Sequence, residues 1–182
     1  MGEWETLTSR VAYENPFMRV HEDTAITPTG KDAIYGYCES TEGSAYIVPV
    51  GEDGQIHLIE QYRYPLKKNY WEIPAGRIPH DEDIAEGARR ELVEETGLQA
   101  VDMTHVGTLL SAPGITNFTS EVFLARKLTK VSDELDADDG INRTHAVSRT
   151  EFRNMVRARS IQCGSSIAAI YMCLDFIEEE KV

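Results

Sequence analysis

Residues 76–98 read GRIPHDEDIAEGARRELVEETGL, and this stretch is the most informative part of the chain. It is rich in helix-forming residues and ends near a glycine. Glu91 and Glu95 are four residues apart and Glu94 is three residues after Glu91, so a helix places these carboxylates at neighbouring positions. Carboxylates so placed repel one another. A bound divalent cation such as Mg²⁺, which prefers carboxylate oxygen, is the natural counter-charge.

The pattern predicts where this helix begins and ends. Asp81 or Asp83 can cap its start, because a short acidic side chain accepts hydrogen bonds from the first free backbone N–H groups. Gly97 can end it in the left-handed conformation. Arg90 lies four residues from an acidic residue on either side, so it can hold carboxylates in place within the helix. The apolar stripe expected to pack on a sheet contains Ile84, Ala88 and Leu92.

This stretch resembles the Nudix box, a pattern of glycine, five residues, glutamate, seven residues and then R-E-U-x-E-E-x-G-U, where U is a bulky aliphatic residue. The matching residues, without departure, are Gly76, Glu82, Arg90, Glu91, Leu92, Glu94, Glu95, Gly97 and Leu98. The resemblance implies hydrolysis of a diphosphate linked to another group, with Mg²⁺ (or Mn²⁺) as cofactor. It also implies Glu91, Glu94 and Glu95 as metal ligands.

Strand and helix patterns predict an α+β fold, an α/β/α sandwich around a mixed β-sheet, as the Nudix resemblance also implies. Expected strands cover residues 10–13, 17–24, 33–38, 106–111 and 120–125, and a hairpin joins 45–50 to 56–61 around the turn 51–54. Residues 70–74 lead into the box, and residues 146–147 can continue a strand. Thr150 is expected to cap a helix that runs through Arg157, and a last helix begins near Ser165. The side chains of this last helix expected to be buried are Ile167, Ile170, Tyr171, Leu174 and Ile177.

The chain of 182 residues is expected to form a single Nudix hydrolase domain, 1–182. Within it, residues 1–40 form an N-terminal antiparallel β-strand region that is too small to hold a core alone, and residues 41–182 form the catalytic core. The strand region is therefore expected to pack on another surface and to support a homodimer.

Composition excludes several partners. The net charge of −13 argues against nonspecific binding of nucleic acid or of an anionic membrane, because both need basic patches. No stretch approaches the roughly 20 apolar residues of a membrane span. The start, MGEWETLTSR, lacks the pattern of a signal peptide, and the scattered Cys38, Cys163 and Cys173 lack metal-ligand spacing. We expect reduced thiols in a cytoplasmic protein.

Residues around the box resemble the ADP-ribose pyrophosphatase subgroup of the Nudix family. They are the stretches QYRYP at 61–65 and WEIPAG at 71–76, and Pro113, which lies fifteen residues after Leu98. This resemblance implies ADP-ribose or another nucleoside diphosphate sugar, such as GDP-mannose or ADP-glucose, as substrate, with a nucleoside monophosphate and a sugar phosphate as products. It also implies the backbone carbonyl of Ala75 as a further metal ligand. Pro113 with Gly114 can equally form a plain turn.

Arginine and aromatic side chains are candidates for substrate contacts. Arg63 and Arg77 can reach the diphosphate with forked hydrogen bonds, although arginines also commonly face solvent. Trp4, Tyr64 and Trp71 can stack on a base or sugar, and core packing is the alternative for Tyr64 and Trp71. Trp4, near the start of the chain, is expected to pack across a dimer.

Several carboxylates are candidates for the residue that activates the attacking water. Glu94 lies beside the expected metal ligands. In the subgroup a glutamate from a late loop often serves, but the corresponding loop here, 135–142, carries aspartate instead. Asp138, Asp139 or Glu121 are therefore the candidate bases, with a solvated acidic loop as the alternative reading of 135–142.

One alternative function changes the class of protein, because a Nudix fold can sense ADP-ribose without cutting it. The intact box argues against such a sensor, which has no need of every metal ligand.

Overall fold

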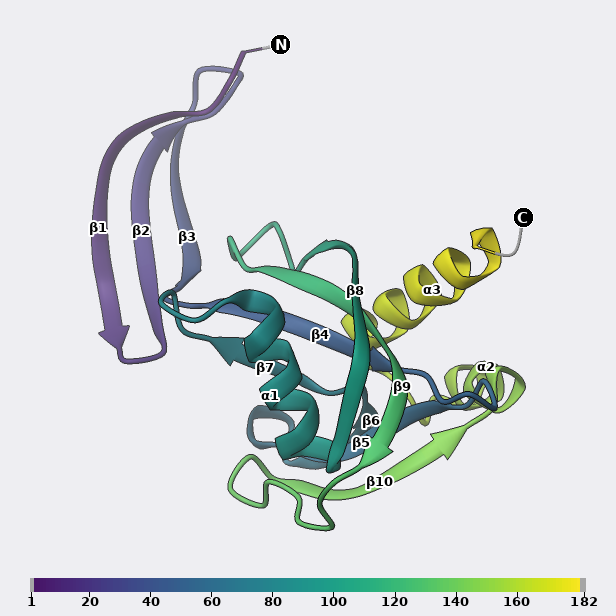
Figure 1. Ribbon diagram of the computed structural model, residues 1–182. Helices are drawn as coiled ribbons and strands as arrows, with labels where there is room; N and C mark the ends of the chain where they lie inside the picture. Colours follow the sequence, from purple (N-terminus) through teal and green to yellow (C-terminus); the bar gives the residue numbers. More distant parts are fainter. Residues whose placement is uncertain (1, 181–182) are drawn as a thin grey trace. The chain divides into compact units, whose positions relative to one another are not determined.

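The computed structural model describes residues 2–180. Its strands are β1 (Glu5–Asn15), β2 (Met18–Ile26), β3 (Asp32–Ser40), β4 (Gly43–Pro49), β5 (Ile56–Arg63), β6 (Lys68–Glu72), β7 (Ala75–Ile78), β8 (Leu98–Leu110), β9 (Thr119–Lys130) and β10 (Ile141–Val147) (Figure 1). Its helices are the 3₁₀ turn η1 (Tyr64–Leu66) and α1 (Ile84–Thr96), α2 (Arg149–Arg157) and α3 (Gly164–Glu179). None of the helices in the described part combines the length and apolar content that crossing a membrane requires.

Contacts divide the chain into two compact units. The first comprises the described residues up to Gly43 together with Leu110–Thr119, and the second comprises Ser44–Leu109 together with the residues from Ser120 onward. The first unit therefore includes a loop from the middle of the chain as well as the expected N-terminal strands.

The first unit is built on an antiparallel sheet in the order β1-β2-β3, as the sequence predicts. β1 and β3 extend beyond the expected strands at both ends, whereas β2 begins one residue later and ends two residues later than expected. Asn15 closes the first turn by accepting hydrogen bonds from the N–H groups of Phe17 and Met18 at 2.8 and 3.0 Å. The loop after β8 joins the sheet through Tyr35, whose hydroxyl donates to the carbonyl oxygen of Gly114 at 2.8 Å.

The second unit contains a mixed sheet in the order β7-β4-β9-β8 and an antiparallel sheet in the order β10-β5-β6. β4 and β9 run parallel, with Ile47 opposite Phe123. Two apolar clusters lie on the two faces of the mixed sheet. One contains Ile47, Ile78, Ala88, Leu92 and Phe123 and joins the sheet to α1, and the other contains Val48, Leu58, Leu124, Phe152 and Ile170 and joins it to β5, α2 and α3. This layering confirms the predicted α/β/α sandwich.

The predicted hairpin between β4 and β5 is wrong. The two strands belong to different sheets and share a single isolated bridge, between Val50 and Ile56. β4 buries Ile47 on one face and Val48 on the other, as a central strand of a sheet covered on both faces does, and its neighbours are β9 and β7 rather than its successor in the chain. The turn 51–54 then carries the chain from one sheet to the other.

Two details of the last helices also differ from expectation. Ser148, rather than Thr150, caps α2, because its hydroxyl accepts from the N–H of Glu151 at 3.1 Å. In α3, Ile170 and Leu174 are buried as predicted, and Ile167 and Ile177 pack at the edge of the core. Tyr171 is exposed, with its ring edge against Phe152, so this member of the predicted stripe is wrong.

Candidate active site

Helix α1 carries the acidic residues, and its ends form as the sequence predicts. Of the two candidate caps, Asp83 is the one used: its Oδ1 accepts from the N–H groups of Ala85 and Glu86 at 3.0 and 3.1 Å. Gly97 ends the helix with φ of 67°, and its N–H donates to the carbonyl of Val93. Glu82 of the box therefore lies just before the helix. Both caps fix where the later carboxylates stand along the helix.

Arg90 connects the carboxylates of the box. Its guanidinium donates to both oxygens of Glu82 at 3.2 and 3.0 Å, and its Nη1 donates to Glu91 and to Glu94, each at 2.8 Å. The expected contact with Glu94 is thus confirmed. The expected contact with Glu86 is not formed, because Glu86 pairs with Arg89 instead, at 3.5 Å. Through Arg90 the site gains a fixed positive charge among its acids, and these hydrogen bonds raise the pKa of Arg90.

Glu95 is the most deeply buried carboxylate of the set, with 1% of its surface exposed. Its Oε2 accepts from the N–H of Ala75, the first residue of β7, at 2.9 Å. Its Oε1 is buried and has no hydrogen-bond partner among residues 2–180. Burial raises the pKa of Glu95 to about 8. A buried acceptor without a donor is costly, and a cation at Oε1 would remove that cost and favour the ionised form.

Glu91 lies between α1 and β7 and owes its place to a glycine. A β-carbon on Gly76 would meet the Glu91 carboxylate, with Cδ at 2.0 Å, so any other residue here would force that carboxylate to move. Burial raises the pKa of Glu91, although Arg90 acts in the opposite direction. The fixed glycine of the box thus makes room for a carboxylate at the strand.

The acidic loop before β10 reaches the same region. The N–H of Asp136 donates to the carbonyl of Glu94 at 3.0 Å, which ties the loop to α1. Burial raises the pKa of both Glu91 and Glu95, and the charge of Asp139 adds to this rise in each case. Asp138 and Asp139 are both exposed in this turn, and Asp139 is the candidate base whose charge acts on both Glu91 and Glu95.

Glu121 is held elsewhere on the mixed sheet. It lies on β9, and its Oε2 contacts His105 Nε2 at 2.5 Å and accepts from the Thr108 hydroxyl at 2.9 Å. Both partners are on β8, and β4 separates β9 from the strand that carries Ala75. The side-chain contacts of Glu121 are therefore with β8.

Arg63 approaches the site from the end of β5. It donates from Nε and Nη2 to the two oxygens of Glu72 at 2.9 and 2.8 Å, a forked pair in which the Glu72 side chain is almost wholly buried. The hydrogen bonds to Glu72 raise the pKa of Arg63, and the charge of Glu95 adds to this rise. Arg77 is exposed on β7, two residues after Ala75, and so projects on the same side of the strand.

The aromatic candidates lie in different settings. Tyr64 is 73% exposed and carries the Lys67 ammonium over its ring, with Nζ 3.0 Å from the ring centroid. Trp71, on β6, packs at the edge of the core and has the Arg143 guanidinium 5.0 Å from its ring centroid. Trp4 belongs to the first unit and makes an edge-to-face contact with Tyr35. All three remain predictions as substrate contacts.

Pro113 also belongs to the first unit, in the exposed loop between β8 and β9. Its neighbour Ala112 has a positive φ of 51°, a conformation that L-residues other than glycine seldom adopt. The hydroxyl of Thr116 donates to the carbonyl of Ser111 and closes the loop. The loop is thus a tightly bonded turn, and a substrate role for Pro113 stays a prediction.

The residues present fit a divalent cation. Within residues 2–180 no set of three or more His, Cys, Asp or Glu side chains already converges as a metal site, because Arg90 holds Glu91 and Glu94. The fit rests instead on the unpaired, buried Oε1 of Glu95 and on the hard oxygen donors beside it. A hard divalent cation is the kind of ion that these oxygen donors select.

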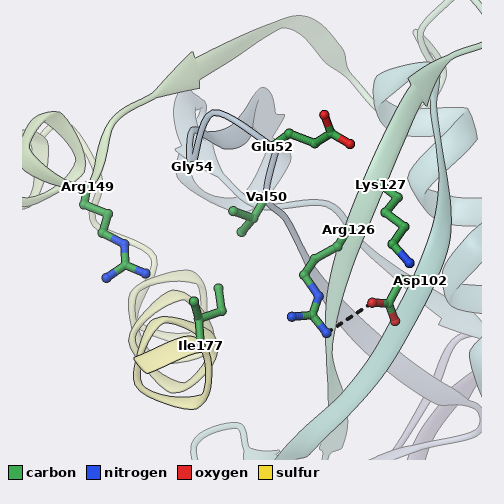
Figure 2. A pocket seen from close by; sticks show the side chains of 9 residues that line it. Val50, Glu52, Gly54, Asp102, Arg126, Lys127, Arg149 and Ile177 are labelled. Atoms are coloured by element: carbon green, nitrogen blue, oxygen red, sulfur yellow. Dashed lines mark ion pairs between the residues drawn. The ribbon is translucent and has the colours of Figure 1, made fainter. Parts of the chain in front are cut away.

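A pocket of about 630 Å³ lies in another part of the second unit (Figure 2). The β4–β5 turn, β8, β9, α2 and α3 line it, whereas β7 and α1 do not. Its arginines are held by acids: Arg126 pairs with Asp102 at 3.1 Å, and Arg149 pairs with Glu178 at 2.6 Å. This pocket is therefore separate from the box carboxylates.

The site combines carboxylate oxygens on one helix with the backbone of an adjacent strand and a nearby arginine. A hydrolase that uses a divalent metal to cleave a phosphate anhydride needs these groups. Residues 41–160 match the NUDIX domain, and residues 4–37 match the nucleoside diphosphate sugar hydrolase N-terminal domain. The chain belongs to the Nudix family of hydrolases, whose members generally use a divalent metal ion.

Relatives of known name cover most of the chain. It is 27% identical over 170 residues to an ADP-ribose pyrophosphatase of Bacillus subtilis, covering 92% of this chain and 91% of the relative. It is 26% identical over 137 residues to a methanol dehydrogenase activator of Bacillus methanolicus, covering 75% and 74%. A crystal structure of an ADP compounds hydrolase superposes with a TM-score of 0.86 at 19% identity, over 99% of this chain and 97% of that one, which shows the same fold.

Sequence reasoning missed three residues of this site. They are Glu72, which holds Arg63, and Gln61 and Asp136, which bond to the backbone of the acidic loop. Two of them gave a signal, since a buried glutamate or glutamine inside an apolar strand needs a partner. The identity of the partners depends on strand pairing, which the sequence does not reveal.

Proposed function

We propose that the protein hydrolyses the diphosphate bond of ADP-ribose with Mg²⁺ as cofactor, releasing AMP and a sugar phosphate. The observation that carries the proposal is the complete box with a buried Glu95 whose Oε1 lacks a partner in the described chain. The choice of ADP-ribose is supported by the match, over nearly the whole length, to a relative named for that activity.

In this proposal Glu91 and Glu95 hold the metal, with the carbonyl oxygen of Ala75 as a third ligand and Glu94 close by. When bound, the ion neutralises phosphate charge and lowers the pKa of a water molecule. Mn²⁺ offers the same preference for oxygen and is expected to substitute. The glycine at position 76 keeps Glu91 against the strand that presents the Ala75 carbonyl.

The residue that takes the proton from water is proposed to be Asp139. It is the candidate base whose charge acts on both Glu91 and Glu95. A general base contributes about 10²–10⁴ in rate, so Asp139→Asn should lower kcat within that range. Asp138→Asn and Glu121→Gln are the comparisons that rank the other candidates.

The substrate is proposed to lie between basic and aromatic side chains. Arg63 and Arg77 would bind the two phosphates, since the arginine fork matches phosphate oxygens. Tyr64, with its exposed ring, and Trp71 are the proposed stacking partners for the base or sugar. Pro113 and Trp4, in the first unit, are the remaining proposed substrate contacts.

The decisive experiment incubates the purified protein with Mg²⁺ and ADP-ribose and measures AMP release by chromatography. Glu95→Gln should lower the rate at least about 100-fold, because it removes a metal ligand. Glu86→Gln, the same change at an exposed position of the same helix, is the matched control and should retain full activity. Binding of ADP-ribose without release of AMP would identify a sensor and reject the hydrolase.

A second substrate class is favoured by one observation. Residues 4–37 match the N-terminal domain of nucleoside diphosphate sugar hydrolases, a broader group. Adding ADP-glucose and GDP-mannose to the same assay ranks this class against ADP-ribose. A kcat/KM for either sugar nucleotide at least about tenfold above that for ADP-ribose would reassign the preferred substrate.

We also propose that the protein is a cytoplasmic homodimer formed through the first unit. The sheet β1-β2-β3 exposes several large apolar side chains, among them Leu7, Val11, Tyr13 and Ile34, the last of which is 74% exposed. Apolar surface gathered on so small a sheet is typical of an interface. The cytoplasm is consistent with the free state of Cys38, Cys163 and Cys173. Sedimentation velocity should give a dimer, and Ile34→Glu should shift it toward the monomer.

A further inference from the structure

Gln61, on β5, is a buried polar residue that the proposed reaction leaves without a role. It is 5% exposed, and its Nε2 donates to the carbonyl oxygen of Asp139 at 2.9 Å. Its Oε1 is buried and lacks a partner among the residues the structure describes. An apolar side chain of similar size would avoid that unpaired oxygen, so packing alone does not account for a glutamine here.

The carbonyl that Gln61 holds belongs to a turn bonded at several points. The Asp136 side chain accepts from the N–H groups of Asp138 and Asp139 at 3.0 and 3.1 Å. The N–H of Tyr62 donates to the carbonyl of Gly140 at 2.9 Å, which ties the turn to β5 a second time. The turn is therefore fixed to β5 on one side, while the Asp136 N–H fixes it to α1 on the other.

We propose that Gln61 is a positioning residue, whose amide holds the 136–140 turn against β5 and so keeps Asp139 beside the box helix, to which the Asp136 N–H also ties the turn. The inference rests on the proposed function, in which Asp139 is the base. β5 also carries Arg63 two residues further on, so Gln61 and Arg63 lie on the same side of the strand. One rigid strand would then place both the base and a phosphate-binding arginine.

The test compares variants that remove the donor but keep the size of the side chain. Gln61→Met cannot donate to the Asp139 carbonyl and also removes the unpaired oxygen, and Gln61→Glu cannot donate when its carboxylate is ionised. The matched control is Gln55→Met, the same change where the amide donates to Asp53 Oδ2, at 2.9 Å, in the turn before β5. Each full-length protein is measured for kcat and KM with Mg²⁺ and ADP-ribose. Amide hydrogen exchange at residues 138 and 139 is measured in the presence of a metal chelator, so that no divalent ion is bound.

The expected result is a split between rate and binding. Gln61→Met should lower kcat by roughly 100-fold, the effect of misplacing a catalytic group by about 1 Å, and leave KM within about twofold. Exchange at residues 138 and 139 should become at least about tenfold faster without metal, while thermal stability stays equal or rises. Gln61→Glu should repeat the loss of kcat, and Gln55→Met should change none of these quantities.

Two results would overturn the positioning role. The first is unchanged exchange at residues 138 and 139 in both Gln61 variants. The second is faster exchange with a normal kcat. Failure of the proposed function is separate, because a wild-type protein without hydrolytic activity would reject it while the exchange measurement still reports whether Gln61 holds the turn.

Discussion

Gly76 and Glu91 are in such close contact that any β-carbon at position 76 would overlap the carboxylate of Glu91, with Cδ at 2.0 Å. The first glycine of the box and its central glutamate are thus one structural unit, although fifteen residues separate them. The glycine is needed for space, since its backbone does not adopt a positive φ.

Gly76→Ala should therefore move Glu91 away from β7. Overpacking of this kind costs about 1–3 kcal/mol of stability, and displacement of a proposed metal ligand should lower kcat as well. Urea unfolding and steady-state kinetics measure the two effects. Gly164→Ala is the control, because a β-carbon there meets no atom within 4 Å. Equal stability and activity in the two variants would contradict the steric explanation.

The forked pair of Arg63 and Glu72 predicts a difference from a similar pair at the surface. Arg63→Met leaves the buried carboxylate of Glu72 unpaired, which should lower the free energy of unfolding by about 2–4 kcal/mol, discounted for the partial exposure of Arg63. Arg143→Met breaks an equally forked pair with Glu60, but Arg143 is largely exposed, so the loss of stability should be clearly smaller than for Arg63→Met. Chemical denaturation of both variants provides the comparison.

A double variant isolates the cause. If the cost of Arg63→Met comes from the uncompensated charge, then adding Glu72→Met should restore much of the stability. Activity should stay low in both variants, because the proposed phosphate contact of Arg63 is gone. Stability that falls further in the double variant would instead assign the cost to lost packing.

The helix cap gives a third prediction. Asp83→Ala removes the acceptor for two N–H groups at the start of α1 and should lower the free energy of unfolding by about 0.5–2 kcal/mol. Asp83→Asn keeps an acceptor oxygen and should lose much less. Thermal unfolding of the two variants checks the ranking, and similar losses would show that the charge rather than the hydrogen bonds stabilises the helix.

The box helix could be predicted from the sequence because its determinants are local. Each of these determinants joins residues a few positions apart, where helical spacing determines which side chains are neighbours. They are the Asp83 cap, the Gly97 end and the contact between Arg90 and Glu94. The match to the Nudix box rests on the same short stretch. The layered fold followed from the alternation of strand and helix patterns.

Contacts made across strands could not be predicted in the same way. The turn at 51–54 has the composition of a hairpin, yet β4 pairs with β9, which lies some seventy residues further along. Arg63 meets Glu72, and Gln61 meets Asp139, only after β5 has taken β6 and β10 as neighbours. The sequence alone indicates which side chains need hydrogen-bonding partners, and the pairing of the strands determines which residues those partners are.

The last prediction concerns Gly97, where the cost of backbone strain can be separated from the cost of a steric clash. It has φ of 67°, and a β-carbon would lie 2.0 Å from the carbonyl oxygen of Ser132, at the start of the acidic loop. Gly54 has a similar φ of 77° but open space around it, so Gly54→Ala should cost only the backbone strain, about 1–2 kcal/mol. Gly97→Ala should cost clearly more and should lower kcat, since it pushes the loop that carries Asp139. Equal losses of stability with unchanged kcat would show that the loop adapts to the added carbon without moving its carboxylate.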